Sequence, residues 1–148
     1  MTATFCPVPW NFQAIQNNGV VRVCCQMNAA STSRGTLRKS DGSVYNAAVD
    51  DLTEARNASL IKEVRKDMME GKWHTECVRC MHEEQSGLSS RRKMELTNWP
   101  TVRAETVAEH TAEDGTIDTD FPVEYYDLRF GNLCNLACRM CGPTDSHT

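Results

Sequence analysis

Three closely spaced cysteines near the carboxyl-terminal end of the sequence have the types and spacing of metal ligands. Cys134, Cys138 and Cys141 form the pattern CxxxCxxC, and three thiolates in one loop can hold an iron–sulfur cluster. A cube of four irons takes one protein ligand per iron, so three cysteines leave one iron with an open coordination position. Because an open position lets a metal centre take part in chemistry, the pattern predicts a reactive [4Fe-4S] cluster. With His147, the same cysteines could instead form a closed Cys3His zinc site.

The segment before these cysteines has the composition of a buried β-strand. Residues 124–130 are rich in aromatic and apolar side chains, and Gly131 and Asn132 then end the strand and begin a loop. Such a loop would lie at the carboxyl end of a strand, which is where parallel α/β barrels keep their active sites.

A second set of cysteines lies in the amino-terminal part of the chain. Cys77 and Cys80 form a CxxC pair, and Cys6 with either Cys24 or Cys25 would complete a four-thiolate site with no vacant position. Adjacent residues on a strand point to opposite faces, so only one of the latter two is expected to face the site. We take Cys24 as the ligand and keep Cys25 as the alternative. Two histidines flank the CxxC pair and could replace a cysteine, namely His74 and His82.

Local patterns predict the elements that carry this second set. Residues 12–16 and 20–24 are β-prone and are joined by Asn-Asn-Gly at 17–19, which indicates a hairpin that brings Cys6 and Cys24 close. A helix is predicted from about Ala58 to Glu70, ended by Gly71. Four apolar residues at helical spacing mark its core face: Leu60, Ile61, Val64 and Met68. Charged residues at 83–84 and 91–92 are expected to form a solvated helix face.

Composition indicates a protein of the cytoplasm. The 148-residue chain has 40% apolar residues, 24% charged residues and a net charge of -4, which is typical of one globular core and argues against binding to nucleic acid. It contains no apolar run of membrane-spanning length, and its first residues lack the features of a signal peptide. In a reducing compartment, the eight cysteines are expected to bind metal rather than to form disulfides.

The CxxxCxxC segment resembles the cluster motif of the radical S-adenosylmethionine (SAM) superfamily. The resemblance implies that the amino and carboxylate groups of SAM chelate the open iron. It further implies that one electron cleaves SAM to methionine and a 5′-deoxyadenosyl radical, which takes hydrogen from a substrate. Met140, before the third cysteine, stands where many members have an aromatic residue near the adenine of SAM. An apolar contact between Met140 and SAM is therefore expected, without ring stacking.

The second set of cysteines looks like the auxiliary domain called SPASM or twitch, which accompanies many radical SAM enzymes. The resemblance covers residues 5–91 and 125–146, and it rests on FCPVPW at 5–10, GVVRVCC at 19–25 and the CxxC pair. Downstream residues extend the resemblance: Glu84, Gly87, Ser89 and Arg91. It implies an auxiliary iron–sulfur cluster on Cys6, Cys24, Cys77 and Cys80, with Glu84 and Arg91 anchoring the fold.

These features predict an α+β cysteine-rich auxiliary domain in residues 1–100 and an acidic linker in 101–121. In 122–148 they predict the first strand and cluster loop of an incomplete α/β (partial TIM-type) radical SAM barrel. A barrel needs on the order of 200 residues beyond its first strand. We therefore expect the amino-terminal part of a longer enzyme, or a chain completed by a second polypeptide. Alone, it is expected to hold at most the auxiliary cluster stably and not to cleave SAM.

Two functions follow as expectations. In the first, the chain belongs to a radical SAM enzyme that modifies a substrate such as a peptide or protein, with flavodoxin or ferredoxin as the electron donor. In the second, it is a non-catalytic iron–sulfur or zinc-binding module with a structural or electron-carrier role. Iron and acid-labile sulfide in the anaerobically purified protein would indicate iron–sulfur clusters, whereas stoichiometric zinc would indicate a structural module.

Overall fold

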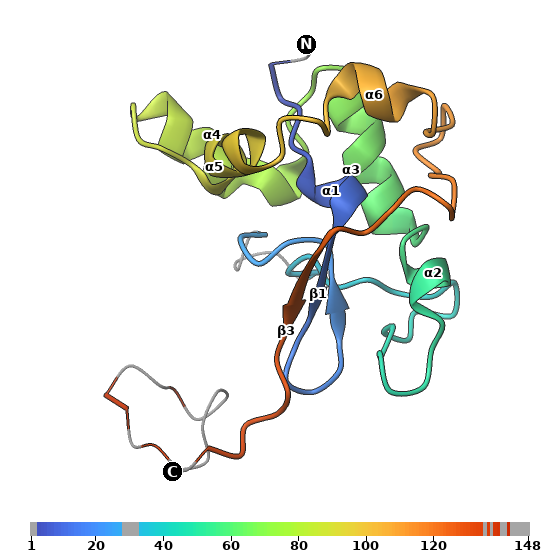
Figure 1. The fold of residues 1–148 in the computed structure, drawn as a ribbon, viewed down its shortest axis with the longest axis vertical. Helices are drawn as coiled ribbons and strands as arrows, with labels where there is room; N and C mark the ends of the chain where they lie inside the picture. Colours follow the sequence, from blue (N-terminus) through green and yellow to red (C-terminus); the bar gives the residue numbers. More distant parts are fainter. Residues whose placement is uncertain (1–2, 28–32, 135, 137, 140–141, 143–148) are drawn as a thin grey trace.

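The structure, a computed structural model, describes residues 3–27, 33–134, 136, 138–139 and 142. A small sheet lies beside a group of helices, and the chain leaves this body after the last strand (Figure 1). The elements follow in the order α1 Val8–Asn11, β1 Phe12–Ile15, β2 Val21–Arg22, α2 Leu52–Ala55, α3 Ser59–Met69, the 3-10 helix η1 Thr75–Cys77, α4 Val78–Gln85, α5 Arg91–Asn98, α6 Ala104–Ala108 and β3 Tyr125–Leu128.

The predicted amino-terminal hairpin is confirmed. β1 pairs with β2 in the antiparallel direction, with Ala14 opposite Arg22 and Ile15 opposite Val21. Gly19 in the connecting turn has a φ of 82°, and a Cβ there would lie 2.3 Å from Oδ1 of Asn46. Only glycine combines this left-handed backbone with so close a neighbour.

β3 pairs with β1 in the parallel direction, which gives the sheet order β2-β1-β3. The register places Phe12 opposite Tyr125 and Ile15 opposite Leu128. The strand predicted at 124–130 therefore has a partner from the amino-terminal segment (Figure 1). Hydrophobic patterning indicated that this strand exists but could not indicate its partner, because pairing between backbones leaves no mark in the sequence.

β3 is less buried than its composition suggested. It lies at the edge of the sheet, and the Tyr126 and Leu128 side chains on one face are 48% and 45% exposed. The other face is covered at Tyr125, whose ring lies 4.8 Å from that of Phe12 and 6.0 Å from that of Trp99. The expectation of a buried strand is thus wrong for one face, because the packing side chains of Phe12 and Trp99 lie on the Tyr125 face of β3.

The predicted central helix is confirmed as α3, which spans residues 59–69. Ile61, Val64 and Met68 are buried, and Gly71 ends the helix with a φ of 76°. These residues join a core that α1, β1, β2 and the segment after α5 complete, including Phe5, Val8, Trp10, Phe12, Ala14, Val21, Val23, Leu37, Val102, Val107 and Ile117. No helix within the described ranges is both long enough and apolar enough to cross a membrane.

Residues 101–121 differ from the exposed linker that their composition suggested. They contain the short helix α6, and Val102, Val107 and Ile117 are at most 5% exposed. Trp10 donates a hydrogen bond from Nε1 to Oγ1 of Thr111 at 2.9 Å. A few buried apolar side chains anchor the segment to the core while most of its residues stay exposed, which an average over composition does not reveal.

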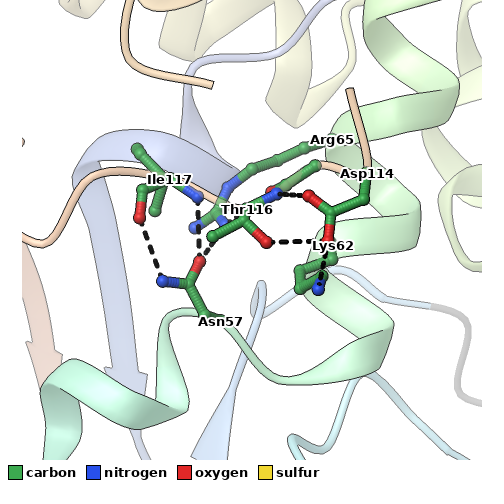
Figure 2. Close-up of polar contacts among 7 residues, drawn as sticks. Asn57, Lys62, Arg65, Asp114, Thr116 and Ile117 are labelled. Carbon is green, nitrogen blue, oxygen red and sulfur yellow. Dashed lines mark hydrogen bonds and ion pairs between the residues drawn. The ribbon is translucent and has the colours of Figure 1, made fainter. Parts of the chain in front are cut away.

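Polar contacts hold the same segment against α3 (Figure 2). Asn57 donates a hydrogen bond from Nδ2 to the Ile117 carbonyl oxygen and accepts one at Oδ1 from the Ile117 backbone N–H, each at 2.9 Å. Arg65 donates to the carbonyl oxygens of Pro9 at 2.9 Å and Gly115 at 3.2 Å. Lys62 forms an ion pair with Asp114 at 2.6 Å. Because Pro9 belongs to α1, Arg65 links this loop to the segment that begins at Cys6.

Candidate metal centre

Four of the predicted ligands line one cavity of about 30 Å³. They are Cys6 before α1, Cys24 after β2, Cys77 at the end of η1 and Cys80 in α4. We call this the four-thiol cavity. The rest of its wall is mostly apolar and consists of Val8, Pro9, Gln26, Met27, Met68, Trp73, Glu76 and Arg92. Cysteines from three separate parts of the chain thus line one cavity.

Local structure explains why Cys6 and Cys24 meet. Cys6 is 8% exposed and is followed by Pro7, which begins α1. Phe5 packs on Trp10 with ring centroids 5.0 Å apart and so anchors the turn around Cys6. The β1–β2 hairpin then returns the chain to the beginning of β1, where Cys24 follows. This is the approach that the hairpin pattern predicted.

The CxxC pair is positioned by η1 and α4. Residues three apart share a helix face, so Cys77 and Cys80 both reach the cavity. His74 serves as the cap of η1, since its Nδ1 accepts a hydrogen bond from the Glu76 backbone N–H at 3.1 Å. His82 is exposed on α4 and is not part of the cavity wall. The described geometry therefore places four cysteines, and neither histidine, around the cavity.

Burial makes the thiolate forms of these cysteines costly. It raises the pKa of Cys6 and Cys80 above the ordinary value and that of Cys77 to about 12. A hydrogen bond from the backbone N–H of Val8 offsets part of this rise in pKa at Cys6, and one from the backbone N–H of Arg92 does so at Cys80. The thiols are therefore protonated at neutral pH, and a bound cation would have to displace their protons.

Cys24 and Cys25 occupy different environments. The Gln26 backbone N–H donates to Sγ of Cys24 at 3.3 Å, as amides commonly do to metal-bound thiolates. The pKa of Cys24 is raised by a hydrogen bond between the two thiols and, to a smaller extent, by burial. The same hydrogen bond lowers the pKa of Cys25 to about 6. Cys25 is half-buried near Arg91 and Asp127 and does not line the cavity.

The donor set of the four-thiol cavity suits a soft metal. Four sulfur donors with an apolar surround are typical ligands of iron–sulfur clusters and of structural zinc. In the part of the chain that the structure describes, no three His, Cys, Asp or Glu side chains already converge as a single metal ion requires. A cavity of this volume holds about one or two water molecules. Binding a larger inorganic group would require the surrounding side chains to move apart.

Arg92 is the one basic residue in the cavity wall. Its guanidinium forms a two-pronged ion pair with Glu84, with Nε to Oε1 at 2.8 Å and Nη2 to Oε2 at 2.5 Å. Ser90 also donates to Oε1 of Glu84 at 2.5 Å. The expected solvated helix face is therefore wrong for these two residues, because the turn between α4 and α5 folds Arg92 back over Glu84.

Arg91, which the resemblance paired with Glu84 as an anchor, has other partners. It contacts Oε1 of Glu95 at 2.5 Å and donates to the Tyr125 hydroxyl at 3.3 Å. Arg91 thus joins α5 to β3, and Arg92 is the residue that joins α5 to α4. Sequence analysis missed Arg92 because charge and spacing alone do not distinguish two adjacent arginines.

The CxxxCxxC segment is described only in part. Cys134 is half-buried and Cys138 is exposed, and the Leu136 backbone N–H donates to Sγ of Cys134 at 3.4 Å. Cys141 and Met140 lie outside the described residues. The segment leaves β3 at the end of the sheet where Ile15 lies, whereas Cys24 follows β2 at the opposite end. The two sets of cysteines are thus approached from opposite ends of one sheet.

Comparison of the chain with protein families, curated proteins and solved structures found no match.

Proposed function

We propose that the chain is part of a radical SAM enzyme and that the four-thiol cavity holds its auxiliary iron–sulfur cluster. One observation carries the proposal: Cys6, Cys24, Cys77 and Cys80 line a single cavity, with Cys6 buried and the other three half-buried. Four thiols from three parts of the chain around one mostly apolar cavity form the donor set that an iron–sulfur cluster takes. We propose a cytoplasmic location, on the composition of the chain.

The two sets of cysteines would do different work. Four protein ligands leave no iron open, so a cluster in the cavity would carry electrons or hold the fold. The CxxxCxxC cysteines offer three ligands, so a cluster there would have an iron free to bind the amino and carboxylate groups of SAM. When bound, that cluster would supply the single electron that cleaves SAM. We infer that Met140 contacts the adenine, and that flavodoxin or ferredoxin is the source of the electron.

The residues of the chain itself would position these groups. Arg65 holds α1 and thereby the segment that begins at Cys6. Arg91 links α5 to Tyr125 on β3, and β3 leads directly to the CxxxCxxC loop. Because β1 pairs with β3 on one side and β2 on the other, the sheet connects the two sets of cysteines. We propose a peptide or protein as the substrate, on the resemblance to SPASM and twitch proteins alone.

A second candidate is a non-catalytic zinc or iron–sulfur module. It is favoured by the same cavity, because a closed set of four thiolates is also the usual ligand set of structural zinc. The two candidates differ in their inorganic content and in the response to SAM.

The proposed function predicts that SAM binds at the CxxxCxxC cluster. A version of the protein extended through the barrel that the resemblance implies is reconstituted anaerobically with iron and sulfide and then reduced with dithionite. Adding SAM should change the electron paramagnetic resonance spectrum, because two SAM groups would bind the open iron. The Cys138→Ser variant of this extended protein, which keeps the four-thiol cavity, should show no such change. An identical spectrum with and without SAM in the unsubstituted extended protein would contradict the enzyme proposal and favour the module.

A further inference from the structure

Arg92 is held rigidly at the wall of the four-thiol cavity. It is 9% exposed, and three kinds of contact fix its guanidinium. Glu84 binds it at two points, the carbonyl oxygen of Phe5 accepts a hydrogen bond at 2.9 Å, and the Trp73 ring lies 5.2 Å away. A long, flexible side chain loses much conformational freedom in such a setting. Its charge is therefore kept in one place.

Each contact partner of Arg92 belongs to a segment that carries one of the thiols or to the wall of the four-thiol cavity. Phe5 precedes Cys6, Glu84 is on the same helix as Cys80, and Trp73 is part of the cavity wall. The positive charge of Arg92 favours the thiolate forms of Cys6, Cys77 and Cys80. Arg92 is thus a cation in the cavity wall whose charge acts on three of the four sulfur donors.

Several carboxylates act in the opposite sense near the cavity, including Glu83 at Cys80 and Asp67 at Cys77. Glu84 is paired with Arg92, and its charge disfavours the thiolate of Cys80. Glu76 is 6% exposed in the cavity wall and accepts a hydrogen bond from Ser33 at 2.5 Å. The net charge beside the thiols therefore depends on groups of both signs, and Arg92 contributes the positive charge.

We propose that the buried pair formed by Arg92 and Glu84 sets the reduction potential of the cluster in the four-thiol cavity. This inference rests on the proposed function. In the one-electron reduction by dithionite, the electron goes to the cluster and adds one negative charge. Arg92 stabilises that charge and Glu84 opposes it, and such interactions are strong where water is scarce. The net charge and hydrogen bonding around a cluster are among the factors that determine its potential.

Removing either charge should shift the potential, in opposite directions. Arg92→Gln should lower it, because the added electron loses a nearby cation. Glu84→Gln should raise it, because a nearby anion is lost. The double variant with both changes should lie between the two. If the pair were merely structural, each substitution would break the same ion pair and the two single variants would behave alike.

The experiment uses the full chain with Cys134, Cys138 and Cys141 replaced by serine, so that only the cavity cluster is measured. Its potential is determined by anaerobic titration followed by electron paramagnetic resonance. The control is the exposed pair formed by Lys72 and Glu70, whose nitrogen and oxygen lie 2.6 Å apart. Because water screens this pair, Lys72→Gln and Glu70→Gln should leave the potential nearly unchanged.

Equal potentials in all variants, or shifts of one sign for Arg92→Gln and Glu84→Gln, would overturn the inference and leave the proposed function standing. A parent chain that binds no iron would overturn both. Arg92→Gln leaves a buried carboxylate unpaired and could fail to fold. In that case Glu84→Gln decides the sign on its own, and Arg92→Lys, which keeps the charge, should stay close to the parent potential.

Discussion

Replacing Cys24 with serine should abolish iron binding at the four-thiol cavity, whereas replacing Cys25 with serine should leave it in place. Cys24 lines the cavity together with the other three thiols, and Cys25 lies outside it near Arg91 and Asp127. A four-ligand site that loses one thiolate loses a full metal–sulfur bond, which a neighbour facing elsewhere does not replace. The two adjacent cysteines are thus a matched pair of target and control.

The measurement is the iron and acid-labile sulfide that stay with the protein after anaerobic reconstitution and desalting. Cys134, Cys138 and Cys141 are replaced by serine in every sample, so that the cavity alone is counted. We expect near-background iron for Cys24→Ser and the parent amount for Cys25→Ser. The reverse pattern would assign the ligand to Cys25 and would mean that the segment after β2 turns over when metal binds.

The second large effect is expected on stability, for Gly115→Ala. Gly115 has a φ of +86°, and a Cβ there would lie 2.0 Å from the Lys62 carbonyl oxygen, which is a backbone atom on α3. The loop would have to leave α3 and would lose the contacts that Arg65 and Asn57 make with it. A left-handed alanine costs about 1–2 kcal/mol, and each lost hydrogen bond adds about 1 kcal/mol. With three such bonds, the total loss should be about 4–5 kcal/mol.

Gly71→Ala is the matched control for this prediction. Gly71 has a similar φ of +76°, but a Cβ there meets nothing within 4 Å. It should therefore cost only the backbone term, about 1–2 kcal/mol. Urea unfolding of the metal-free, reduced protein, followed by circular dichroism, measures both free energies. Equal losses for the two variants would show that residues 114–117 do not pack on α3 as described.

The elements that could be predicted from the sequence are those with a local cause. A glycine-containing turn between two β-prone runs indicates the hairpin, and apolar residues at helical spacing indicate α3. The gathering of Cys6 and Cys24 follows from the hairpin, and that of Cys77 and Cys80 follows from one helical turn. That these thiols hold a metal remains a prediction.

The features that could not be predicted depend on contacts between distant parts of the chain. The parallel pairing of β1 with β3 joins segments more than a hundred residues apart, and it involves backbone atoms that every sequence shares. The anchoring of residues 101–121 depends on Val107 and Ile117, which join the core formed by distant parts of the chain. The place of Arg92 at the cavity depends on the turn between α4 and α5, which decides whether Arg91 or Arg92 faces Glu84.

The central claim is that the four-thiol cavity binds an iron–sulfur cluster, and its most direct test is the inorganic content of the cavity. The chain with Cys134, Cys138 and Cys141 replaced by serine is purified without oxygen, and its iron, sulfide and zinc are measured per chain. We expect iron and sulfide in equal amounts, about two of each for a [2Fe-2S] cluster or about four of each for a [4Fe-4S] cluster, with little zinc. Stoichiometric zinc without sulfide, or a folded chain without metal, would contradict it.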